Sequence, residues 1–429
     1  MPAALTAVQR TLSNGVHLIA TPVPHTAAVS LYVASRAGSG SEPAELSGVT
    51  HFVEHMLFRH RSHEPGAFAC AIERLGGQIN AATEPELTAV GAKVPSEAWA
   101  DALQIVARMV HEPTMDPDEI EKERTVILDE LALLDDLPEE SARRSVLARL
   151  WPNHPYGREI AGTATTVRAL TRDALLGRAV EMFAGRNTIV SVAGALDPAA
   201  VLDVLADVFA SVPAGSREVY PVFHANGQES GRVQVIRREA EQAYFSIAGF
   251  TPGRASRDRY AIELLAAVLG AGFGARLVLE LRERHGLAYD VSAEFGYCGK
   301  HGVLSIDGAT DPDDLTRAVA IVLGELSDVA DRGVTEEEFE RARAYTVGGL
   351  VRSLEDSAVV AAWHAREQAL EPSPLPPDAL IERIRTVTRS DVTASARACL
   401  APRWPLIAVA GPLSDNTGIP TDLVTTGGG

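Results

Sequence analysis

The sequence predicts an α+β protein made of two homologous repeats, each an antiparallel sheet with helices packed on one face. Three observations support this class. The chain has 429 residues, which is more than one hydrophobic core usually serves. Its hydrophobic content of 46% supplies material for two cores. Stretches with strand and helix periodicity alternate along the chain, and parts of the first half recur in the second.

A repeat in the sequence indicates where the two units divide. Residues 167–172, VRALTR, match residues 384–389, IRTVTR, and the triplet VAG occurs at 192–194 and again at 409–411. Both matches are offset by 217 positions (from 171 to 388 and from 192 to 409), which is about half the chain. The simplest explanation is duplication of one α+β unit.

This repeat predicts four segments. An N-terminal repeat covers residues 1–213 and a C-terminal repeat covers residues 232–415. The linker between them, residues 214–231, contains Gly215 and a polar stretch that interrupts the hydrophobic periodicity. The tail, residues 416–429, ends in TTGGG and is expected to be disordered.

Periodicity places the main elements within each repeat. The Thr-Arg pairs at 171–172 and 388–389 are expected to begin helices, and each helix is followed by a short buried strand that glycine closes. The expected strands are residues 28–33, 189–192, 233–236 and 406–409, and the expected helices are residues 97–110 and 318–326.

Composition argues against several classes of protein. The net charge of −18 disfavours binding to nucleic acid and to anionic lipid surfaces. No apolar run reaches the roughly 18 residues that span a bilayer, and the first residues, MPAAL, lack the basic and apolar regions of a secretory signal. Cys70, Cys298 and Cys399 are odd in number and widely spaced, which favours reduced thiols. A cytoplasmic protein without a membrane or nucleic-acid partner is therefore expected.

The motif that carries chemistry is His51-Phe52-Val53-Glu54-His55. On an α-helix the two histidines lie on one face, where both imidazoles can bind one Zn²⁺ at about 2.0–2.1 Å. Glu54 can lean over the metal without binding it and take a proton from a metal-bound water. The order H-x-x-E-H is also a zinc-peptidase signature. The sequence therefore predicts a zinc hydrolase with one zinc ion per chain.

A catalytic zinc ion needs a third protein ligand, and a downstream helix offers candidates. The sequence DPDE is typical of a helix start, with Asp116 as cap, Pro117 in the first position and Glu119 closing a capping box. On the helix that follows, Glu123 and Glu130 are seven residues apart and share a face. A solvated acidic face is the alternative that composition alone favours.

Residues 48–58, GVTHFVEHMLF, resemble the active-site helix of the pitrilysin/insulinase metallopeptidases, peptidase family M16. In that family the third ligand is a glutamate in a downstream E-R-x-x-x-x-x-E segment. Glu130 lies 75 positions after His55 and ends the stretch ERTVILDE, which resembles this segment. The resemblance implies that His51, His55 and Glu130 bind zinc, and that Glu123 is an acid that orients the site.

The resemblance covers nearly the whole chain. Residues 11–16 resemble the family's opening L-x-N-G strand, and residues 75–83 resemble its G-G-x-x-N-A-x-T segment. Residues 154–163 contain its H-P-Y-G and G-T pairs. Residues 38–42 and 59–61 depart from the usual G-S-R-x-E and K-G-T, which leaves the substrate preference open.

The second half of the chain lacks the histidine pair. Its residues 281–289, LRERHGLAY, resemble the family's L-R-E-x-x-G-L-A-Y segment, in which an arginine and a tyrosine hold the substrate carbonyl against the metal. The resemblance gives these roles to Arg282 and Tyr289, because a guanidinium and a phenol can stabilise an oxyanion. From the residues alone, a surface arginine and a core tyrosine are the simpler interpretation.

The resemblance also has consequences for assembly. Family members of this length (subfamily M16B, similar to mitochondrial processing peptidase) carry two repeats and associate in pairs. This chain is therefore expected to form one half of a clamshell, in which Tyr289 of one chain completes the zinc site of the other. A homodimer is the first expectation, and a heterodimer with a related M16 subunit is the alternative.

The expected function is a zinc endopeptidase that hydrolyses extended oligopeptides or leader segments inside a dimeric chamber. Glu54 takes a proton from the zinc-polarised water and later gives one to the leaving amine. The strand around Asn80 and Ala81 is expected to bind the substrate backbone by edge addition. Two alternatives stay open: a leader-removing subunit of a heterodimeric maturation peptidase, and a non-catalytic structural subunit of a peptidase-like assembly.

Overall fold

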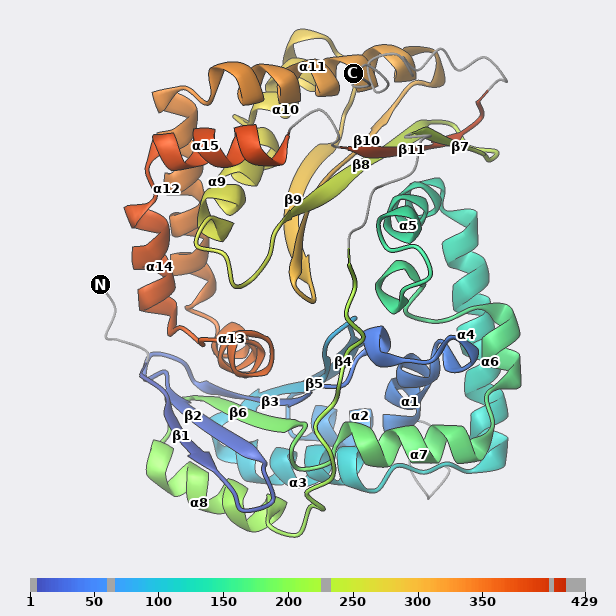
Figure 1. Ribbon diagram of the computed structural model, residues 1–429. Helices are drawn as coiled ribbons and strands as arrows, with labels where there is room; N and C mark the ends of the chain where they lie inside the picture. Colours follow the sequence, from blue (N-terminus) through green and yellow to red (C-terminus); the bar gives the residue numbers. More distant parts are fainter. Residues whose placement is uncertain (1–5, 60–65, 225–232, 401–404, 414–429) are drawn as a thin grey trace. The chain divides into compact units, whose positions relative to one another are not determined.

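The computed structural model describes residues 6–59, 66–224, 233–400 and 405–413, which divide into two compact units (Figure 1). Unit 1 is formed by Met1–Leu131, Glu159–Pro221 and Val351–Leu380, and unit 2 by Ala132–Arg158, Val222–Leu350 and Ile381–Gly429. Both units combine a sheet with helices, so the predicted α+β class is confirmed.

Each unit takes one helical segment from the opposite half of the sequence. Residues 132–158 belong to unit 2, and residues 351–380 belong to unit 1. Along the chain, unit 1 passes into unit 2 between Pro221 and Val222, inside the predicted linker 214–231, whereas the two exchanged segments cross the predicted repeats. The four predicted segments stay a prediction. Part of that linker and the predicted tail, residues 416–429, lie outside the described residues.

A six-stranded sheet in the order β1-β2-β6-β3-β5-β4 forms the centre of unit 1. Its strands are β1 (Val8–Thr11), β2 (His17–Pro22), β3 (Ala28–Ser35), β4 (Gln78–Thr83), β5 (Thr88–Pro95) and β6 (Thr188–Gly194). All neighbours are antiparallel except β2 and β6, which are parallel and are joined through a long stretch containing several helices. β4 is an edge strand, and within the described residues its one strand partner is β5.

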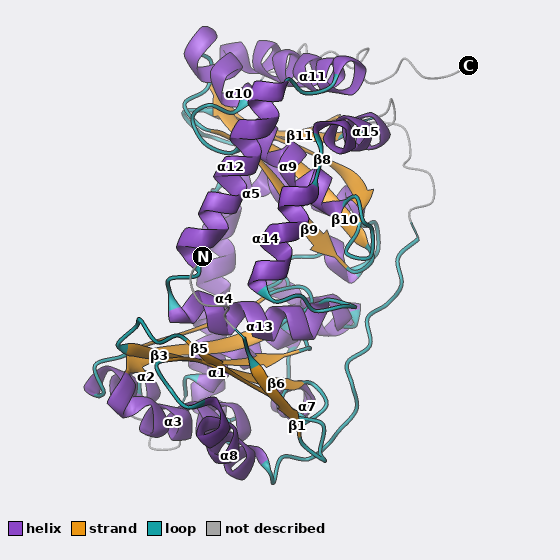
Figure 2. Ribbon diagram, turned by 90° about the vertical axis from the view of Figure 1, so that its left-hand side faces the viewer, coloured by secondary structure: helices purple, strands orange, loops and turns teal. Residues whose placement is uncertain are grey.

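Helices cover both faces of this sheet (Figure 2). One face packs on helices that share a single hydrophobic core: α1 (Val49–Leu57), α2 (Ala67–Arg74), α3 (Trp99–His111), α4 (Pro117–Asp136), α6 (Ala164–Ala169), α7 (Arg172–Met182) and α8 (Pro198–Phe209). On the other face, α13 (Ser357–Leu370) packs against β3 and β6. A helix on this second face of the sheet was not predicted. Because β6 is buried at every position, both faces of the sheet must be covered there.

Unit 2 is built on a five-stranded sheet in the order β7-β11-β8-β10-β9. Its strands are β7 (Val233–Arg237), β8 (Ala243–Pro252), β9 (Val291–Cys298), β10 (His301–Thr310) and β11 (Leu406–Gly411). The β7–β11 pair is parallel, and the other pairs are antiparallel. α5 (Pro138–Leu150) packs against β8 and β11, as α13 does against β3 and β6 in unit 1.

The remaining helices and turns complete the two units. They are α9 (Arg259–Gly270), α10 (Arg276–Val278), the π-helix η5 (Leu279–Arg284), α11 (Leu315–Arg332), α12 (Glu336–Ser353), α14 (Pro377–Thr386) and α15 (Arg389–Cys399), with 3-10 turns at Ser39–Ser41, Ala44–Leu46, Ser96–Ala98, Pro155–Gly157 and Pro312–Asp314. Among the described residues, each helix is too short or too polar to cross a membrane.

The sequence repeat corresponds to equivalent elements of the two units. Thr171 caps α7 by accepting a hydrogen bond from the N–H of Ala174, and Thr388 caps α15 in a capping box with Asp391. β6 and β11 follow the same pattern, since both are buried throughout and end at glycine. These predicted helix starts and buried strands are confirmed.

One expected strand is a turn instead. β1 ends at Thr11 and β2 begins at His17, so most of residues 11–16 form the turn of a hairpin. Gly15 has a φ of 94°, and the Leu12 N–H donates to the Val16 carbonyl at 2.9 Å. An Asn-Gly pair favours such a turn, because both residues tolerate positive φ more readily than others. The other expected strands and helices are present with small shifts at their ends, except that the helix expected at 318–326 extends over Leu315–Arg332.

Candidate metal centre

Helix α1 begins where two backbone segments cross closely. Gly48 has a φ of 92°, and a Cβ there would lie 2.5 Å from the carbonyl oxygen of Ala161. The buried carboxylate of Glu42 accepts hydrogen bonds from the N–H groups of Gly48 and Thr50, each at 2.8 Å. Burial raises the pKa of Glu42, and these donors oppose the shift. A carboxylate from the segment just before the helix thus caps the positive end of the helix dipole.

His51 and His55 lie on one face of α1, as their spacing predicts. Their ring centroids are 4.6 Å apart. Burial, with a smaller contribution from His55, lowers the pKa of His51 to about 4. The His51 ring is therefore neutral near pH 7, which is the form that binds metal.

Glu130 of α4 completes a set of three potential ligands. Its Oε2 atom lies 3.8 Å from Nε2 of His51 and 3.7 Å from Nε2 of His55. One ligand atom from each residue lies within 4.8 Å of the other two. In a tetrahedral site with bonds of about 2.0–2.1 Å, neighbouring ligand atoms are roughly 3.3 Å apart, so small side-chain movements suffice. Two imidazoles and one carboxylate fit a zinc ion with one open position.

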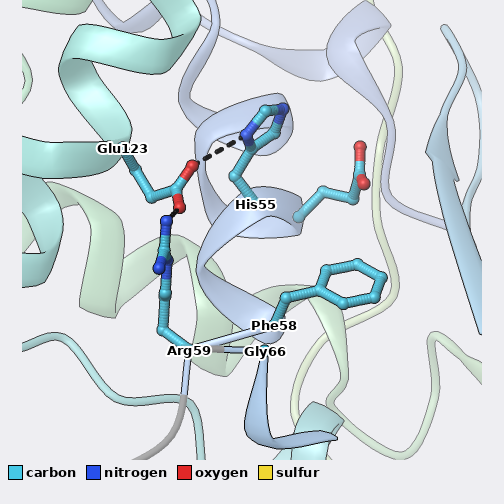
Figure 3. A pocket seen from close by; sticks show the side chains of 6 residues that line it. His55, Phe58, Arg59, Gly66 and Glu123 are labelled. Carbon is cyan, nitrogen blue, oxygen red and sulfur yellow. Dashed lines mark hydrogen bonds and ion pairs between the residues drawn. The ribbon is translucent and has the colours of Figure 1, made fainter. Parts of the chain in front are cut away.

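Glu123 holds the second ring nitrogen of His55 (Figure 3). Its Oε2 atom is 3.0 Å from Nδ1 of His55, and its other oxygen forms an ion pair with Arg59. Arg59 also approaches Glu119 at 3.4 Å. Because the carboxylate accepts the Nδ1 proton, the lone pair of the ring lies on Nε2, the atom that faces Glu130.

Glu54 lies beside the three potential ligands without belonging to them. Its Oε2 atom accepts a hydrogen bond of 3.2 Å from the hydroxyl of Thr83 on β4. Burial raises the pKa of Glu54; His55 and Thr83 oppose this shift and Glu130 adds to it. A cavity of about 360 Å³ adjoins Glu54 (Figure 3), and its lining residues are Glu54, His55, Phe58, Arg59, Gly66 and Glu123.

The position of α4 relative to α1 decides whether Glu130 reaches the histidines. Pro117 is the first residue of α4, and Asp116 accepts a hydrogen bond from the N–H of Asp118, so the predicted helix start is confirmed. Further along α4, the Arg124 guanidinium lies 5.3 Å from the ring centroid of Phe52 on α1. Arg124 therefore links the two helices at Phe52, the residue that follows His51.

The predicted substrate-binding residues lie on the edge strand β4. Asn80 pairs with Gly91 of β5, and Ala81 pairs with Val90. Ala81 points toward the hydrophobic core and α1, so Asn80 points to the opposite face of the sheet. The outer edge of β4 carries no strand in the described part of the chain, so its backbone groups are open to a peptide.

Arg282 and Tyr289 lie together in unit 2, not in the unit that holds the ligands. The Arg282 guanidinium is 4.9 Å from the ring centroid of Tyr289 and 5.3 Å from that of Phe273. Tyr289 is 81% exposed, so the interpretation of a core tyrosine is wrong. Their predicted role at a zinc site stays a prediction.

Four residues of these arrangements were not predicted: Glu42, Arg59, Thr83 and Phe273. Glu42 lies in the segment 38–42 that departs from the family's usual pattern, and Thr83 lies in a segment that resembles it. Local sequence rules do not show that Thr83 reaches Glu54. Arg59 lies four residues after His55, and its charge was the one available signal. Nothing in the sequence indicated that Phe273 stacks on an arginine.

His111 and His154, which have no spacing that indicates ligation, make packing and hydrogen-bond contacts. The His111 ring lies 5.3 Å from that of Phe209, and His154 accepts a hydrogen bond from the N–H of Tyr156. His60 and His63 lie outside the described residues.

The sequence matches two family models in succession. Residues 16–164 match the model described as insulinase (peptidase family M16). The histidine pair and Glu130 lie within this matched range. Residues 169–345 match the model described as peptidase M16 inactive domain. Arg282 and Tyr289 lie within this matched range. The two matches meet between residues 164 and 169, and together they cover most of the chain.

Full-length relatives and solved structures agree with these models. An uncharacterised zinc protease of Mycobacterium tuberculosis is 33% identical over 430 residues, which cover 98% of this chain and 97% of the relative. An uncharacterised zinc protease of Streptomyces coelicolor is 30% identical over 416 residues, covering 94% and 89% respectively. A crystal structure of a protease from Helicobacter pylori has the same fold, with a TM-score of 0.87 at 20% identity over 95% of this chain and 100% of that chain. This chain therefore belongs to peptidase family M16, the insulinase family, as its motifs predicted.

Proposed function

We propose that this chain is a zinc-dependent endopeptidase that cleaves peptides in an extended conformation. The observation that carries the proposal is the convergence of His51, His55 and Glu130 within 4.8 Å, with Glu54 beside them. These three residues would hold the ion. A bound zinc ion would supply Lewis acidity and lower the pKa of a water molecule to about 7.

Glu54 is the residue that moves the proton. Its carboxylate is buried, keeps one hydrogen bond to Thr83, and has a pKa raised by burial. A raised pKa makes the carboxylate a better base, and the proton that it has taken can pass to the leaving amine. Glu123 contributes by holding the ring of His55, and it does not touch the reacting atoms.

The substrate backbone is expected to extend the sheet at β4. Asn80 and Ala81 are central in this strand, and Thr83 at its end contacts the proposed base. A peptide that hydrogen-bonds along β4 is thereby led to the metal centre. Edge addition recognises an extended backbone, which folded proteins do not present at this site.

The central experiment replaces Glu54 by glutamine. We expect Glu54→Gln to keep one zinc per chain, measured by elemental analysis, and to lose cleavage of a mixed peptide library. Glu45→Gln, an exposed carboxylate on the segment before α1, is the matched control and should retain both properties. Retained cleavage by Glu54→Gln would exclude this residue as the base. A chain that neither contains zinc nor gains activity when zinc is added would favour the non-catalytic structural subunit.

We further propose that Arg282 and Tyr289 act on the zinc site of a second chain, so that a homodimer of half-clamshells holds two complete sites. Complementation tests this arrangement. Glu54→Gln and Tyr289→Phe chains should each be inactive alone, whereas an equal mixture should recover about a quarter of the wild-type activity, because half of the dimers are mixed and each has one complete site. No recovery on mixing contradicts the shared site. Activity that depends on a related M16 chain instead would favour the heterodimeric maturation peptidase.

A further inference from the structure

A groove runs along the open edge of β4 within unit 1. Its volume is about 910 Å³, and it is lined by residues of β3, β4, β5, α2 and α13. Figure 2 shows α13 and α2 on opposite sides of the sheet, so the groove wraps around the edge at which a peptide strand would add. The polar residues of its lining are Tyr32, Glu73, Gln78, Asn80, Lys93 and Asp356.

The charges on the α13 side of this groove neutralise one another. Lys93 Nζ lies 2.9 Å from Oδ1 of Asp356, and this contact holds the pKa of Asp356 below its usual range. Asp356 also caps α13 by accepting a hydrogen bond of 2.8 Å from the N–H of Ala358. The Lys93–Asp356 pair therefore stabilises the start of α13, and its two charges cancel, so it attracts a charged ligand only weakly.

Glu73, in the last turn of α2, is different. It is exposed, it lines the groove, and within the described residues its carboxylate makes no hydrogen bond or ion pair. It is thus the carboxylate that the groove leaves without a countercharge. The overall net charge of −18 adds a negative field of the same sign.

Strand alternation relates Glu73 to the metal centre. Ile79, Ala81 and Thr83 project from the same side of β4, and Thr83 contacts Glu54. A peptide strand on β4 has side chains on that side at every second residue. The residue opposite Ile79 is four positions from the residue opposite Thr83, which is about 13 Å along the strand at roughly 3.3 Å per residue. That position lies on the α2 side, where the groove contains Glu73.

We infer that this groove is a specificity subsite for a basic side chain, four residues from the substrate residue that lies opposite Thr83. The aliphatic stem of a lysine or arginine would pack on Ala69 and Ile79, and its cationic end would meet Glu73. The inference rests on the proposed peptidase function and narrows its substrates to extended peptides with a positive charge four residues from the residue that lies opposite Thr83.

A positional scan tests the subsite. In one extended peptide, each position in turn carries lysine or the uncharged norleucine, and the dissociation constant is measured with zinc-loaded Glu54→Gln chains. We expect one position at which lysine is preferred by roughly two- to five-fold, as for an ion pair at a partly exposed site. Adding Glu73→Gln should abolish that preference, and adding Glu73→Lys should transfer it to glutamate. Glu97→Gln, an exposed carboxylate of unit 1 outside the groove, should leave it unchanged.

A steric variant tests the groove independently of charge. Val359→Trp should fill it from the α13 side and weaken binding of peptides long enough to cross it, but not of peptides that end near Thr83. Val180→Trp, on the exposed face of α7, is the matched control. Equal effects of Val359→Trp on long and short peptides would contradict the proposed path.

The outcomes separate this inference from the proposed function. Cleavage by the wild-type chain with no lysine preference at any position overturns the subsite and leaves the peptidase function intact. A lysine preference in binding that survives Glu73→Gln also overturns it. A lysine preference that Glu73→Gln abolishes supports the subsite, whether or not the wild-type chain cleaves the peptides. Lack of cleavage by the wild-type chain would count against the proposed peptidase function alone.

Discussion

Replacing Glu123 by glutamine tests how the proposed site would hold zinc. The carboxylate lies 3.0 Å from Nδ1 of His55, its side chain is 6% exposed, and its other oxygen pairs with Arg59. Glutamine keeps the shape and can still accept the Nδ1 proton, but it removes a charge that solvent does not screen. Loss of such a partner weakens metal binding by about 10–100-fold, which corresponds to about 1.4–2.7 kcal/mol. We expect the zinc dissociation constant to rise by this factor while Arg59 remains paired with Glu119.

The assay is competition for zinc with a chromophoric chelator at fixed pH. Asp129→Asn is the control, because Asp129 is an exposed carboxylate next to Glu130 on the same helix. It changes the net charge near the metal equally without touching His55. Equal weakening of zinc binding by both variants would mean that only the overall negative charge near the metal matters. Unchanged zinc binding by Glu123→Gln would refute the argument from the contact between Glu123 and His55.

Three further predictions concern the surroundings of the site and one carboxyl group of unit 2. Glu42→Gln should lower the free energy of unfolding in urea by about 1–3 kcal/mol, because an amide oxygen cannot replace both acceptor oxygens at the start of α1; exposed Glu45→Gln should change it little. Thr83→Val removes a donor that lowers the pKa of Glu54, so the acid limb of kcat/KM should move to higher pH with zinc content unchanged; an unmoved limb would contradict the contact. Burial raises the pKa of Glu263 from 4.5 to about 7, so the folded chain keeps a proton that the unfolded chain loses, and stability falls as pH rises through this range. Glu263→Gln should therefore stabilise the chain by about 1–3 kcal/mol above pH 7 and have little effect near pH 4, as thermal melts at the two values would show.

Much of the fold could be predicted because it follows local rules. The Thr-Arg helix starts at 171 and 388 and the buried strands β6 and β11 were visible as a repeat of short patterns. The hairpin turn at Asn14 and Gly15 was misjudged, because family resemblance was followed where the turn chemistry of the two residues was the stronger signal. The exchange of α5 and α13 between the units left no local signal, since a helix shows that it has an apolar face but not which sheet covers it.

By itself, the sequence determined the pair of imidazoles and the carboxylate between them. The spacing of His51 and His55 places both rings on one face of any helix that they form, whatever surrounds it. Only the tertiary structure decided that Glu130 meets them, that Thr83 contacts Glu54, and that a groove with Glu73 follows the edge of β4. The contacts of Glu130 and Thr83 join segments far apart in the chain, and α13 contributes to the groove from the opposite half of the sequence. They exist because packed cores set the distances between helices and strands to within a few ångströms, which no local spacing rule can do.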